Sequence, residues 1–422
     1  MTTRSRTHGL RALVAGTAAA LVLGACGGSG FTGSAAGTTG PSQQSGRAAL
    51  KVLVATGGTA DLDSVKEAAA AWAQKTGNTI EVSPAQDQQQ QLAQGFAAGN
   101  PPDVFFLDAS LFPTYAKAGN LFDYGDQIKN LDFYPALKQS FTYKGSLYCA
   151  PKDFSNLGLV INTDLWAAAG LTDADTPRTW AQLESVARKL TTKGVVGLGL
   201  GDTHDRVDAF LKQAGGTVTN ADQTQVTADT PANVAGLTFV QKLLAEKVAA
   251  FPKQLDSGWS GEALGKGKAA MVVEGNWFTG AAAADYPKLK WRVAELPAGP
   301  AGKGTLTFTQ CWGVAQAGKH HEQSVDFVKS LFTTRQQLAF ASAFGVMPSL
   351  VSARAAYAAS IPASQKAWLA GAEYAVGPVS APGLDPVMKD YDTKLQGLPG
   401  ASPATILATV QKNGAAALKA GG

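Results

Sequence analysis

The stretch LKVLVATGG, Leu50–Gly58, is the first segment of the chain with the pattern of a folded domain. Its aliphatic residues predict a buried strand, and the glycine pair predicts a tight turn at its end. A helical pattern over Asp61–Thr76, the strand-like TIEV and a helical pattern over Gln88–Ala98 follow. DVFFLD, Asp103–Asp108, then predicts a third strand. Strands that alternate with helices in this way predict βαβ units and a parallel sheet.

The alternation continues through the rest of the chain. Strand-like segments recur at SLYCAP (Ser146–Pro151), LGLVIN (Leu157–Asn162), GVVGLGL, KAAMVVEG and LTFTQCWGVA, with helical patterns between them. From Pro362 onward the pattern is mostly helical. The predicted fold class is therefore α/β in two lobes, each with a mixed or parallel sheet flanked by helices. In such folds a ligand binds in the crevice where strand ends meet.

The N-terminus has the features of a secretory signal peptide. Three arginines precede an apolar run, Ala12–Leu23, which is too short to span a bilayer as a helix. LGAC, Leu23–Cys26, resembles the bacterial lipobox, in which the cysteine receives lipid and becomes the first residue of the mature protein. We therefore expect a signal peptide over residues 1–25 and lipidation of Cys26. The alternative is an ordinary signal peptide that contains a cysteine.

The segment after this cysteine has the composition of a linker. Residues 26–49 are rich in Gly, Ser, Thr, Ala and Gln and show no apolar pattern, so we expect them to be flexible. With a lipid on Cys26, such a linker would hold the folded part at the extracytoplasmic face of the bacterial cell membrane. No later stretch of the sequence is long and apolar enough to cross a bilayer.

Charge and motifs exclude several classes of function. The formal net charge is +4, and the three arginines of the signal peptide account for all but +1 of it. A near-neutral body argues against nucleic acid as a partner. The sequence contains no G-x-S-x-G, no H-E-x-x-H and no G-x-x-x-x-G-K-[ST] motif, and no His, Cys and carboxylate cluster with metal-ligand spacing. We therefore expect a protein without catalytic residues, metal or cofactor.

Four segments resemble, in order along the chain, the sugar-binding family of extracellular solute-binding proteins of ABC importers, typified by maltose-binding protein. Within Gln94–Phe332 they are QGFAAGNPPDVFFLDASLFPTYAKAGNLFDYGD, LGLVINTDLWAAAGLTDADTPRTWAQL, LGKGKAAMVVEGNWF and ELPAGPAGKGTLTFTQCWGVAQAGKHHEQSVDFVKSLF. The chain departs from that pattern at one residue and in one segment. Leu107 stands where the maltose binder has a large aromatic residue, and Pro382–Met388 contains no aromatic residue. Both departures argue against a maltose-type ligand.

The resemblance implies a two-lobed, periplasmic-binding-protein-like fold with hinge crossings between the lobes. We expect one lobe to comprise residues 50–150 with about 311–345, and the other 151–310 with about 346–422. The resemblance also implies a monomer that captures a mono- or oligosaccharide between the lobes and delivers it to ABC permease subunits in the membrane. Because the chain has no nucleotide-binding motif, separate subunits would supply the ATPase activity.

Predicted strand ends carry the polar candidates for ligand binding. The hydroxyl groups of a sugar need hydrogen-bond partners in fixed directions, and those to charged groups are the stronger ones. Asp108, Asp153, Glu274 and Asn276 are the candidates for this role. Asp108 has an alternative role as the cap of the following helix, and Asp153 as a solvated turn residue.

Three tryptophans are the aromatic candidates, because the C–H face of a sugar needs a flat apolar surface. Trp277 follows a strand at the stacking position implied by the resemblance, with a core position as the alternative. Trp312 lies within a strand, and the sequence favours neither a ligand contact nor a core position for it. Trp259 lies in a loop, where it could be part of a lid, a ligand contact or an ordinary surface residue. Gly58 and Thr59 form the first strand–helix turn, where backbone N–H groups could meet a ligand oxygen. Tight-turn geometry alone also explains the glycines.

Two cysteines remain once Cys26 is set aside. The resemblance implies that the strands holding Cys149 and Cys311 run side by side at the hinge, so we predict a disulfide between them in an oxidising compartment. Two buried free cysteines are the alternative.

Two other functions stay open on the sequence. The same fold could bind a non-sugar solute, such as a glycerophosphate compound, a polyamine or a metal ion. A surface glycosidase needs only two carboxylates, and Asp108, Asp153 and Glu274 are the candidates for them.

Overall fold

The computed structural model describes residues 47–55 and 59–421. The predicted signal peptide, Cys26 with most of its linker, and Gly58 lie outside the described residues. Within them, one 11-stranded sheet has the central order β2-β1-β3-β11-β6-β9-β7-β8, with β10 and β12 paired to β6 and β13 paired to β11. Its strands are β1 (Ala49–Val54), β2 (Thr79–Pro84), β3 (Val104–Asp108), β6 (Ala150–Asn162), β7 (Val196–Gly199), β8 (Ala249–Ala250), β9 (Ala269–Gly275), β10 (Trp291–Ala294), β11 (Thr305–Val314), β12 (Met347–Pro348) and β13 (Ala375–Val376).

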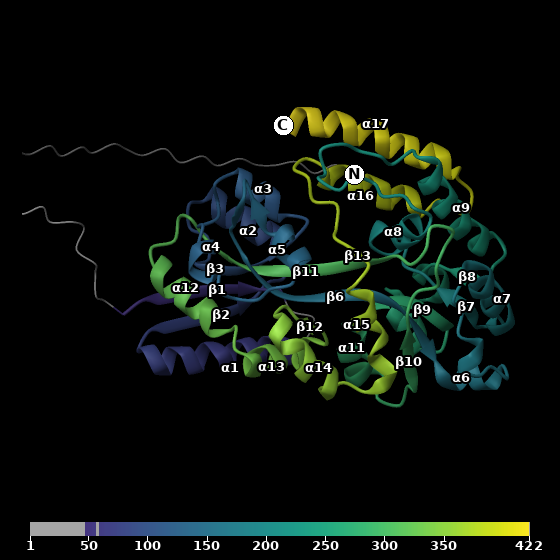
Figure 1. The fold of residues 1–422 in the computed structure, drawn as a ribbon, viewed down its shortest axis with the longest axis horizontal. Helices are drawn as coiled ribbons and strands as arrows, with labels where there is room; N and C mark the ends of the chain where they lie inside the picture. Colours follow the sequence, from purple (N-terminus) through teal and green to yellow (C-terminus); the bar gives the residue numbers. More distant parts are fainter. Residues whose placement is uncertain (1–46, 56–58, 422) are drawn as a thin grey trace, which may run out of the picture. The chain divides into compact units, whose positions relative to one another are not determined.

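A separate pair, β4 (Thr142–Tyr143) and β5 (Ser146–Leu147), forms a small antiparallel ladder. Helices cover both faces of the large sheet (Figure 1). They are α1 (Thr59–Thr76), α2 (Gln88–Ala97), α3 (Phe112–Lys117), α4 (Gly125–Ile128), α5 (Pro135–Ser140), α6 (Thr163–Ala168), α7 (Trp180–Leu190), α8 (His204–Gln213), α9 (Pro231–Ala245), α10 (Ser260–Gly265), α11 (Phe278–Asp285), α12 (His321–Ser330), α13 (Thr334–Phe344), α14 (Arg354–Ser360), α15 (Ala367–Gly371), α16 (Asp385–Leu395) and α17 (Pro403–Gly421).

The first strands and helices form the predicted βαβ units. β1 pairs in parallel with β2 and with β3, and the helices α1 and α2 connect them. Gly77 follows α1 with a φ of 74°, the left-handed conformation that commonly ends a helix. The prediction of an α/β fold with parallel strands is confirmed for this part of the chain.

We call the part built around β1–β3 lobe 1 and the part built around β7–β10 lobe 2. Each has its own apolar clusters: Leu50, Val52 and Trp72 belong to lobe 1, and Leu159, Leu198 and Val240 to lobe 2. The two lobes share one continuous sheet, so the strands between them decide how they are joined.

Two long strands, β6 and β11, connect the lobes and run side by side (Figure 1). The sequence predicted two separate strand-like segments, Ser146–Pro151 and Leu157–Asn162, but the structure has a single strand, β6, from Ala150 to Asn162. Four polar residues in its middle hid this continuity: Lys152, Asp153, Ser155 and Asn156. They are buried in the sheet, and the pairing with β11 extends across them with one register shift, between Gln310 and Cys311.

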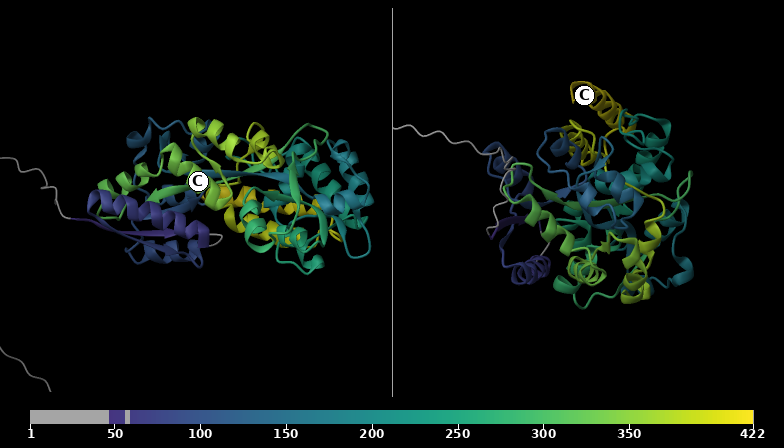
Figure 2. Two further views of the ribbon diagram at one scale, coloured as in Figure 1. Left: turned by 90° about the horizontal axis from the view of Figure 1, so that it is seen from below. Right: turned by 60° about the vertical axis from the view of Figure 1, so that its left-hand side comes forward.

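The C-terminal segments return to both lobes. Leu350 and Ala353 still pack in the same apolar cluster as Leu50 of lobe 1. Beyond them, α16 and α17 pack together and against lobe 2 (Figure 2). The lobe boundaries predicted from the sequence, near 346 in this region, remain a proposal.

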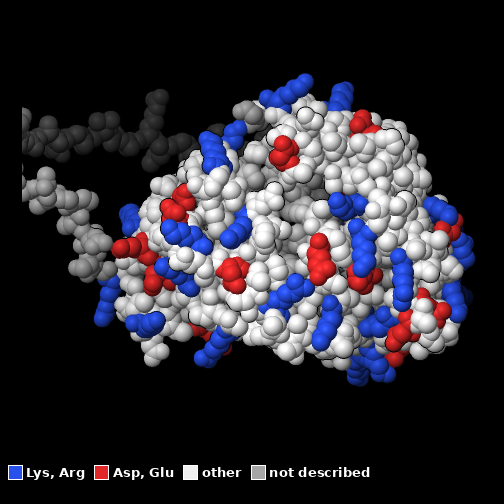
Figure 3. Space-filling view, viewed as in Figure 1, with Lys and Arg blue, Asp and Glu red and all other residues white. Residues whose placement is uncertain are grey.

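The charges on the face shown in Figure 3 are of both signs, with Lys and Arg interspersed among Asp and Glu. Among the residues that the structure describes, every helix is too short or too polar to cross a membrane.

Candidate functional site

A cavity of about 360 Å³ lies between the two lobes. One side is formed by the end of β3 and by α3, the floor by β11, and the other side by α8, α16 and the segment before α16. Its volume is in the range usual for small-molecule sites. The lining residues are Asp108, Ala109, Ser110, Thr114, His204, Asp205, Phe308, Thr309, Pro378, Val379, Ala381, Asp385, Met388, Lys389 and Asp392.

Asp108 is the predicted site residue that the structure places in this cavity. It is the last residue of β3, is half-buried, and accepts a hydrogen bond of 2.9 Å from the side-chain amide of Gln310. Burial raises the pKa of Asp108, whereas the hydrogen bond from Gln310 and the charge of Lys152 lower it. The carboxylate therefore has one neutral side-chain partner and lines the space where a ligand would need acceptors.

The floor of the cavity contains an aromatic residue that the sequence analysis missed. Phe308 lies on β11, where exposure alternates from Thr305 to Gln310, and its ring is on the half-buried side with Leu306 and Gln310. This alternation was the available signal, because a strand that crosses between lobes must expose its middle to the space between them. Ser155 of β6 pairs with Phe308 and is 3 % exposed. Its hydroxyl group has no hydrogen-bond partner among the described residues.

The side formed by α8 and α16 holds a charged histidine. The His204 Nδ1 atom lies 2.7 Å from an oxygen of Asp392, and its Nε2 atom lies 3.3 Å from Asp205. Burial lowers the pKa of His204, but the hydrogen bond to Asp392 and the charges of Asp205 and Asp208 outweigh it and raise the pKa to about 9. His204 is therefore an imidazolium at neutral pH, shared by two carboxylates.

A second titratable pair lies directly behind this histidine. The Tyr391 hydroxyl donates to Asp208 at 3.1 Å. Burial raises the pKa of Asp208 to about 7, against the lowering effect of His204. Burial and the charge of Asp208 also raise the pKa of Tyr391 well above its ordinary value. The residues of α8 and α16 form this cluster only because the helices pack together, so no local motif signalled it.

Lys389 on α16 makes two contacts near the cavity. Its ammonium group lies 2.9 Å from Asp385 and 3.4 Å from the side-chain oxygen of Gln89 on α2. The second contact joins lobe 2 to lobe 1. The two cationic residues that line the cavity, His204 and Lys389, are thus both paired with carboxylates.

Glu274 and Trp277 lie next to the cavity rather than in its lining. Glu274 is 1 % exposed, and its Oε2 atom accepts hydrogen bonds from Trp277 Nε1 and Arg206 Nη2, both at 3.0 Å. Trp277 is half-buried, and its ring packs edge-on against Phe308 with centroids 5.3 Å apart. The structure therefore brings both residues close to the cavity floor through Phe308.

Asp153 and Asn276 are both engaged within the protein. Asp153 is buried in β6 and forms an ion pair with the adjacent Lys152. Burial raises its pKa, and Lys152 opposes this shift. Asn276 is 1 % exposed, its Oδ1 atom accepts from the backbone N–H of Asn156 at 3.1 Å, and its Nδ2 atom has no partner among the described residues. Asp153 is therefore not the solvated turn residue considered above.

Trp312 lies in the core of lobe 1 and does not reach the cavity. It is 0 % exposed, and its ring packs edge-on against Phe106 at 4.6 Å and Phe327 at 5.9 Å. As β11 enters the centre of the sheet both of its faces are covered, so the alternation that exposes Phe308 ends before Trp312. A ligand contact for Trp312 is therefore not supported.

The other two predicted contacts also lie away from the cavity lining. Trp259 is half-buried and packs against Phe278 in lobe 2, with ring centroids 6.2 Å apart. Thr59 is the exposed first residue of α1. Gly58 falls outside the described residues, so its place stays a prediction.

The structure contains a disulfide between Cys149 and Cys311, with Cα atoms 5.5 Å apart. Both cysteines are 0 % exposed and belong to an apolar cluster with Leu107 and Phe112 of lobe 1. Cys311 also pairs with Leu107, the residue before Asp108. The bridge therefore lies beneath the β3 side of the cavity.

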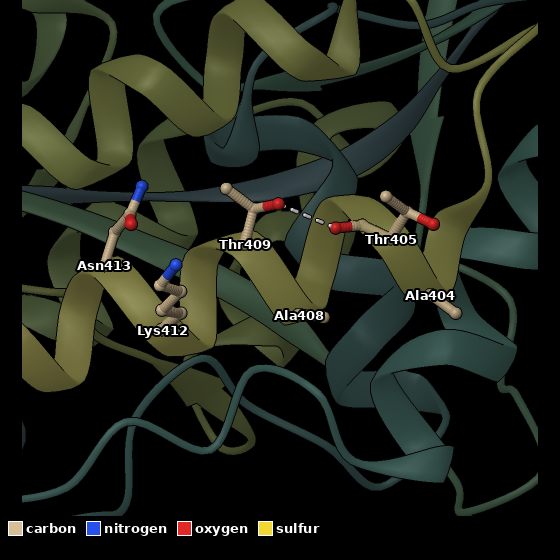
Figure 4. A pocket seen from close by; sticks show the side chains of 6 residues that line it. All are labelled: Ala404, Thr405, Ala408, Thr409, Lys412 and Asn413. Atoms are coloured by element: carbon tan, nitrogen blue, oxygen red, sulfur yellow. Dashed lines mark hydrogen bonds between the residues drawn. The ribbon is translucent and has the colours of Figure 1, made fainter.

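A second hollow, of about 510 Å³, lies along α17 (Figure 4). All six side chains that line it come from this one helix, and the Thr409 hydroxyl donates back to the carbonyl of Thr405 at 2.9 Å. It is an open face of a single helix, where no second element supplies a binding group. Across the described ranges, 47–55 and 59–421, no three His, Cys, Asp or Glu residues are grouped so as to hold a metal ion.

Proteins of known structure share this fold. The ABC substrate-binding protein Lmo0181 of Listeria monocytogenes, solved with cycloalternan, superimposes with a TM-score of 0.79 over 87 % of this chain and 98 % of its own, at 22 % identity. The maltose-maltodextrin binding protein of Alicyclobacillus acidocaldarius superimposes with a TM-score of 0.75 over 87 % and 99 %, at 21 % identity. Both likenesses show the two-lobed binding-protein fold that the sequence predicted.

Curated relatives match part of the chain. The diacetylchitobiose binding protein DasA of Streptomyces coelicolor is 27 % identical over 279 residues, which cover 62 % of this chain and 63 % of DasA. A maltooligosaccharide ABC transporter solute-binding lipoprotein of Streptococcus pneumoniae is 27 % identical over 61 % of this chain and 62 % of its own length. The chain thus matches less than two thirds of the length of these relatives.

The model of one protein family, the bacterial extracellular solute-binding proteins, matches residues 56–338. This range includes β3, α8, β9 and β11, which carry Asp108, Arg206, Glu274 and Phe308. This match agrees with the two lobes joined by β6 and β11 and with the cavity between them. The chain belongs to the bacterial extracellular solute-binding protein family.

Proposed function

We propose that this protein is the substrate-binding component of a carbohydrate ABC importer. It captures a mono- or oligosaccharide between its lobes and delivers it to permease subunits in the membrane. The observation that carries the proposal is the cavity between the lobes, where Asp108 from lobe 1 and Phe308 from the connecting strand face the same space.

The chemistry of the cavity suits a polyhydroxylated ligand. Asp108, Ser110, Thr114 and Thr309 offer oxygens to sugar hydroxyls, and Phe308 offers an apolar ring to a C–H face. The names of the two curated relatives, a diacetylchitobiose binder and a maltooligosaccharide lipoprotein, support a saccharide ligand. The two departures from the maltose-binder pattern, Leu107 and Pro382–Met388, keep the identity of the sugar open.

Capture would close the lobes about the two connecting strands. β6 and β11 are the hinge, lobe 1 comprises residues 50–150 with about 311–345, and lobe 2 comprises 151–310 with about 346–422. Lipid on Cys26 and the following linker would keep the protein at the extracytoplasmic membrane face, close to its permease. The relative that is named a solute-binding lipoprotein supports this placement.

The cavity disfavours an anionic solute. A phosphate ligand needs convergent basic groups, and the lining cations, His204 and Lys389, are both paired with carboxylates. A glycosidase needs two carboxylates free to act on the substrate. Asp153 is bound to Lys152, and Glu274 is bound to Arg206 and Trp277. These contacts support a role in binding without chemistry.

The test is a thermal-shift and calorimetric screen of the whole protein. The panel comprises glucose, maltotetraose, N,N′-diacetylchitobiose, glycerol 3-phosphate and spermidine. A saccharide that binds should raise the melting temperature, because it stabilises the native state alone. It should be recovered unchanged after long incubation. If only glycerol 3-phosphate or spermidine binds, the carbohydrate proposal is wrong. If the saccharide is cleaved, the proposal of binding without chemistry is wrong.

A matched pair of variants locates the site within this screen. Phe308→Ala should weaken saccharide binding, because truncating a central aromatic anchor often costs about 2 kcal/mol or more. Trp259→Ala removes a larger aromatic residue that lies outside the cavity lining, so affinity should stay unchanged. Equal losses in both variants would contradict the placement of the site.

A further inference from the structure

The starting point is a buried carboxylate next to the cavity. Glu274 is 1 % exposed, and a charge so deeply buried is costly unless it is paired and hydrogen-bonded. Its Oε2 atom receives two donors, Arg206 Nη2 and Trp277 Nε1, each at 3.0 Å. Glu274 therefore ties the orientation of the indole ring to that of the guanidinium group.

The Arg206 guanidinium also covers aromatic surface. Its central carbon lies 4.9 Å from the ring centroid of Trp277 and 5.9 Å from that of Phe308. The stem of the side chain passes close to Gly201, where an added Cβ would lie only 2.7 Å from Arg206 Cγ. The glycine thus leaves the room that the arginine needs to reach both rings.

These contacts lead to the cavity in one further step. The rings of Trp277 and Phe308 meet edge-on with centroids 5.3 Å apart, and Phe308 lines the cavity floor. Glu274, Arg206, Trp277 and Phe308 form what we call the Arg206 cluster. Arg206 and Trp277 each contact the other three members, and Arg206 is the member that pairs with the buried charge of Glu274 and lies over both rings.

We propose that Arg206 is a positioning residue of the binding site: by pairing with Glu274 and covering Trp277 and Phe308, it fixes the aromatic floor against which the saccharide packs. This inference rests on the proposed function. An aromatic floor that is already ordered spares the ligand the entropy of ordering it on binding. Arginine suits the position because its planar guanidinium group can donate to a carboxylate from one edge while its flat face stacks on aromatic rings.

Arg188 provides a matched control within the same lobe. It also pairs with carboxylates, Glu184 at 2.9 Å and Glu246 at 2.8 Å, but its side chain is 56 % exposed and lies on α7, outside the cavity lining. Replacing either arginine by lysine keeps the charge. Only Arg206→Lys removes a planar group from aromatic rings near the cavity.

The experiment has a ligand-free arm and a saccharide arm on the whole protein. The ligand-free arm records the indole N–H nuclear magnetic resonance of Trp277, assigned by its loss in Trp277→Phe. We expect Arg206→Lys to shift and broaden this signal and to speed its hydrogen exchange, while Arg188→Lys leaves it unchanged. Arg206→Gln, which keeps a planar donor without the charge, serves as the second variant if the lysine variant does not fold.

The saccharide arm measures affinity for N,N′-diacetylchitobiose and maltotetraose by calorimetry. Arg206→Lys should bind roughly 3- to 10-fold more weakly than the unsubstituted protein, the size expected for ordering an aromatic side chain on binding. Arg188→Lys should bind as tightly as the unsubstituted protein. Simple loss of stability would not produce this effect in a variant whose melting temperature matches that of Arg188→Lys.

Each outcome decides the inference. An unchanged Trp277 signal in the folded Arg206 variants overturns it, and so does a changed signal with unchanged saccharide affinity. If the unsubstituted protein binds no saccharide, the proposed function fails. The ligand-free signal then decides alone whether Arg206 holds Trp277.

Discussion

The two sides of the cavity differ in how their charges are satisfied. On the β3 side, the carboxylate of Asp108 has a neutral partner, the amide of Gln310. On the side formed by α8 and α16, His204 is bound to Asp392, and Lys389 to Asp385. One side keeps an acceptor for a ligand. On the other side both cations are already paired with carboxylates, and the His204–Asp392 pair joins α8 to α16.

This difference separates affinity from stability. A substitution on the β3 side should change what the cavity binds, because hydrogen bonds there are completed by the ligand. A substitution on the α8–α16 side should change how lobe 2 packs and how it responds to pH. The following predictions test this division, from the largest expected effect to the smallest.

The largest effect should come from the disulfide beneath the β3 side. Replacing Cys149 and Cys311 by serine releases a loop closed across 162 positions, which on the chain-entropy model costs about 5 kcal/mol as an upper estimate. Urea unfolding of Cys26→Ser protein with and without the two further substitutions measures this change. Thiol titration of the denatured, unreduced Cys26→Ser protein should find no free thiol. Two titratable thiols would show that the bridge does not form.

Trp312→Ala should destabilise the fold by about 3–5 kcal/mol, the usual cost of removing a large buried aromatic residue. The ring is 0 % exposed and packs against Phe106 and Phe327, so the variant should have a lower melting temperature. Trp259→Ala should lower the melting temperature less, because Trp259 is only half-buried. A Trp312→Ala protein of full stability and lost saccharide affinity would return Trp312 to the binding site.

Asp108→Asn should weaken saccharide binding by about 1.5–3 kcal/mol, the contribution of a hydrogen bond to a charged acceptor. Calorimetry with the saccharide that most raises the melting temperature provides the measurement. Asp205→Asn, on the opposite side, is the matched control, because Asp205 is already bound to His204. If the control loses as much affinity as Asp108→Asn, the two sides do not differ as described.

The smallest effect should be a pH dependence on the α8–α16 side. The pKa of His204 is raised from 6.5 to about 9, so its stabilising charge is fully present below about pH 6.5 and is lost as the pH rises through about 9. The melting temperature should therefore fall over this interval, and His204→Gln should flatten the fall. His320→Gln, at the start of α12, is the matched control. An unaltered slope in His204→Gln would assign the pH dependence to other groups.

Local sequence patterns predicted much of lobe 1. The strand and helix over Leu50–Thr76 and the strand DVFFLD were recovered because apolar periodicity and glycine turns act within a few residues. The spacing of Thr179 and Gln182 in the sequence predicts a capping box at the start of α7, and it forms only in part. Thr179 accepts from the N–H of Gln182, but the Gln182 side chain accepts from the N–H of Arg178.

The site was predicted where it depends on strand ends and missed where it depends on packing. Asp108 was found because ligand sites gather at the carboxyl ends of parallel strands. His204 and Asp392 were missed, because they are 188 positions apart and meet only when α16 packs on α8. Trp312 and Phe308 lie on the same strand, and their exposure is set by what covers each stretch of it.

The position of β11 in the sheet has a consequence for the order in which the protein can fold. β11 lies between β3 and β6, yet its first residue, Thr305, follows the start of β6 by about 155 positions. Protein synthesis proceeds at about 5–20 residues per second. Once the start of β6 has been made, the edges of β3 and β6 that pair with β11 would therefore stay unpaired for on the order of 10–30 s, until β11 has been made. During this time neither lobe can close its sheet on the other. The cavity is therefore among the last features to form.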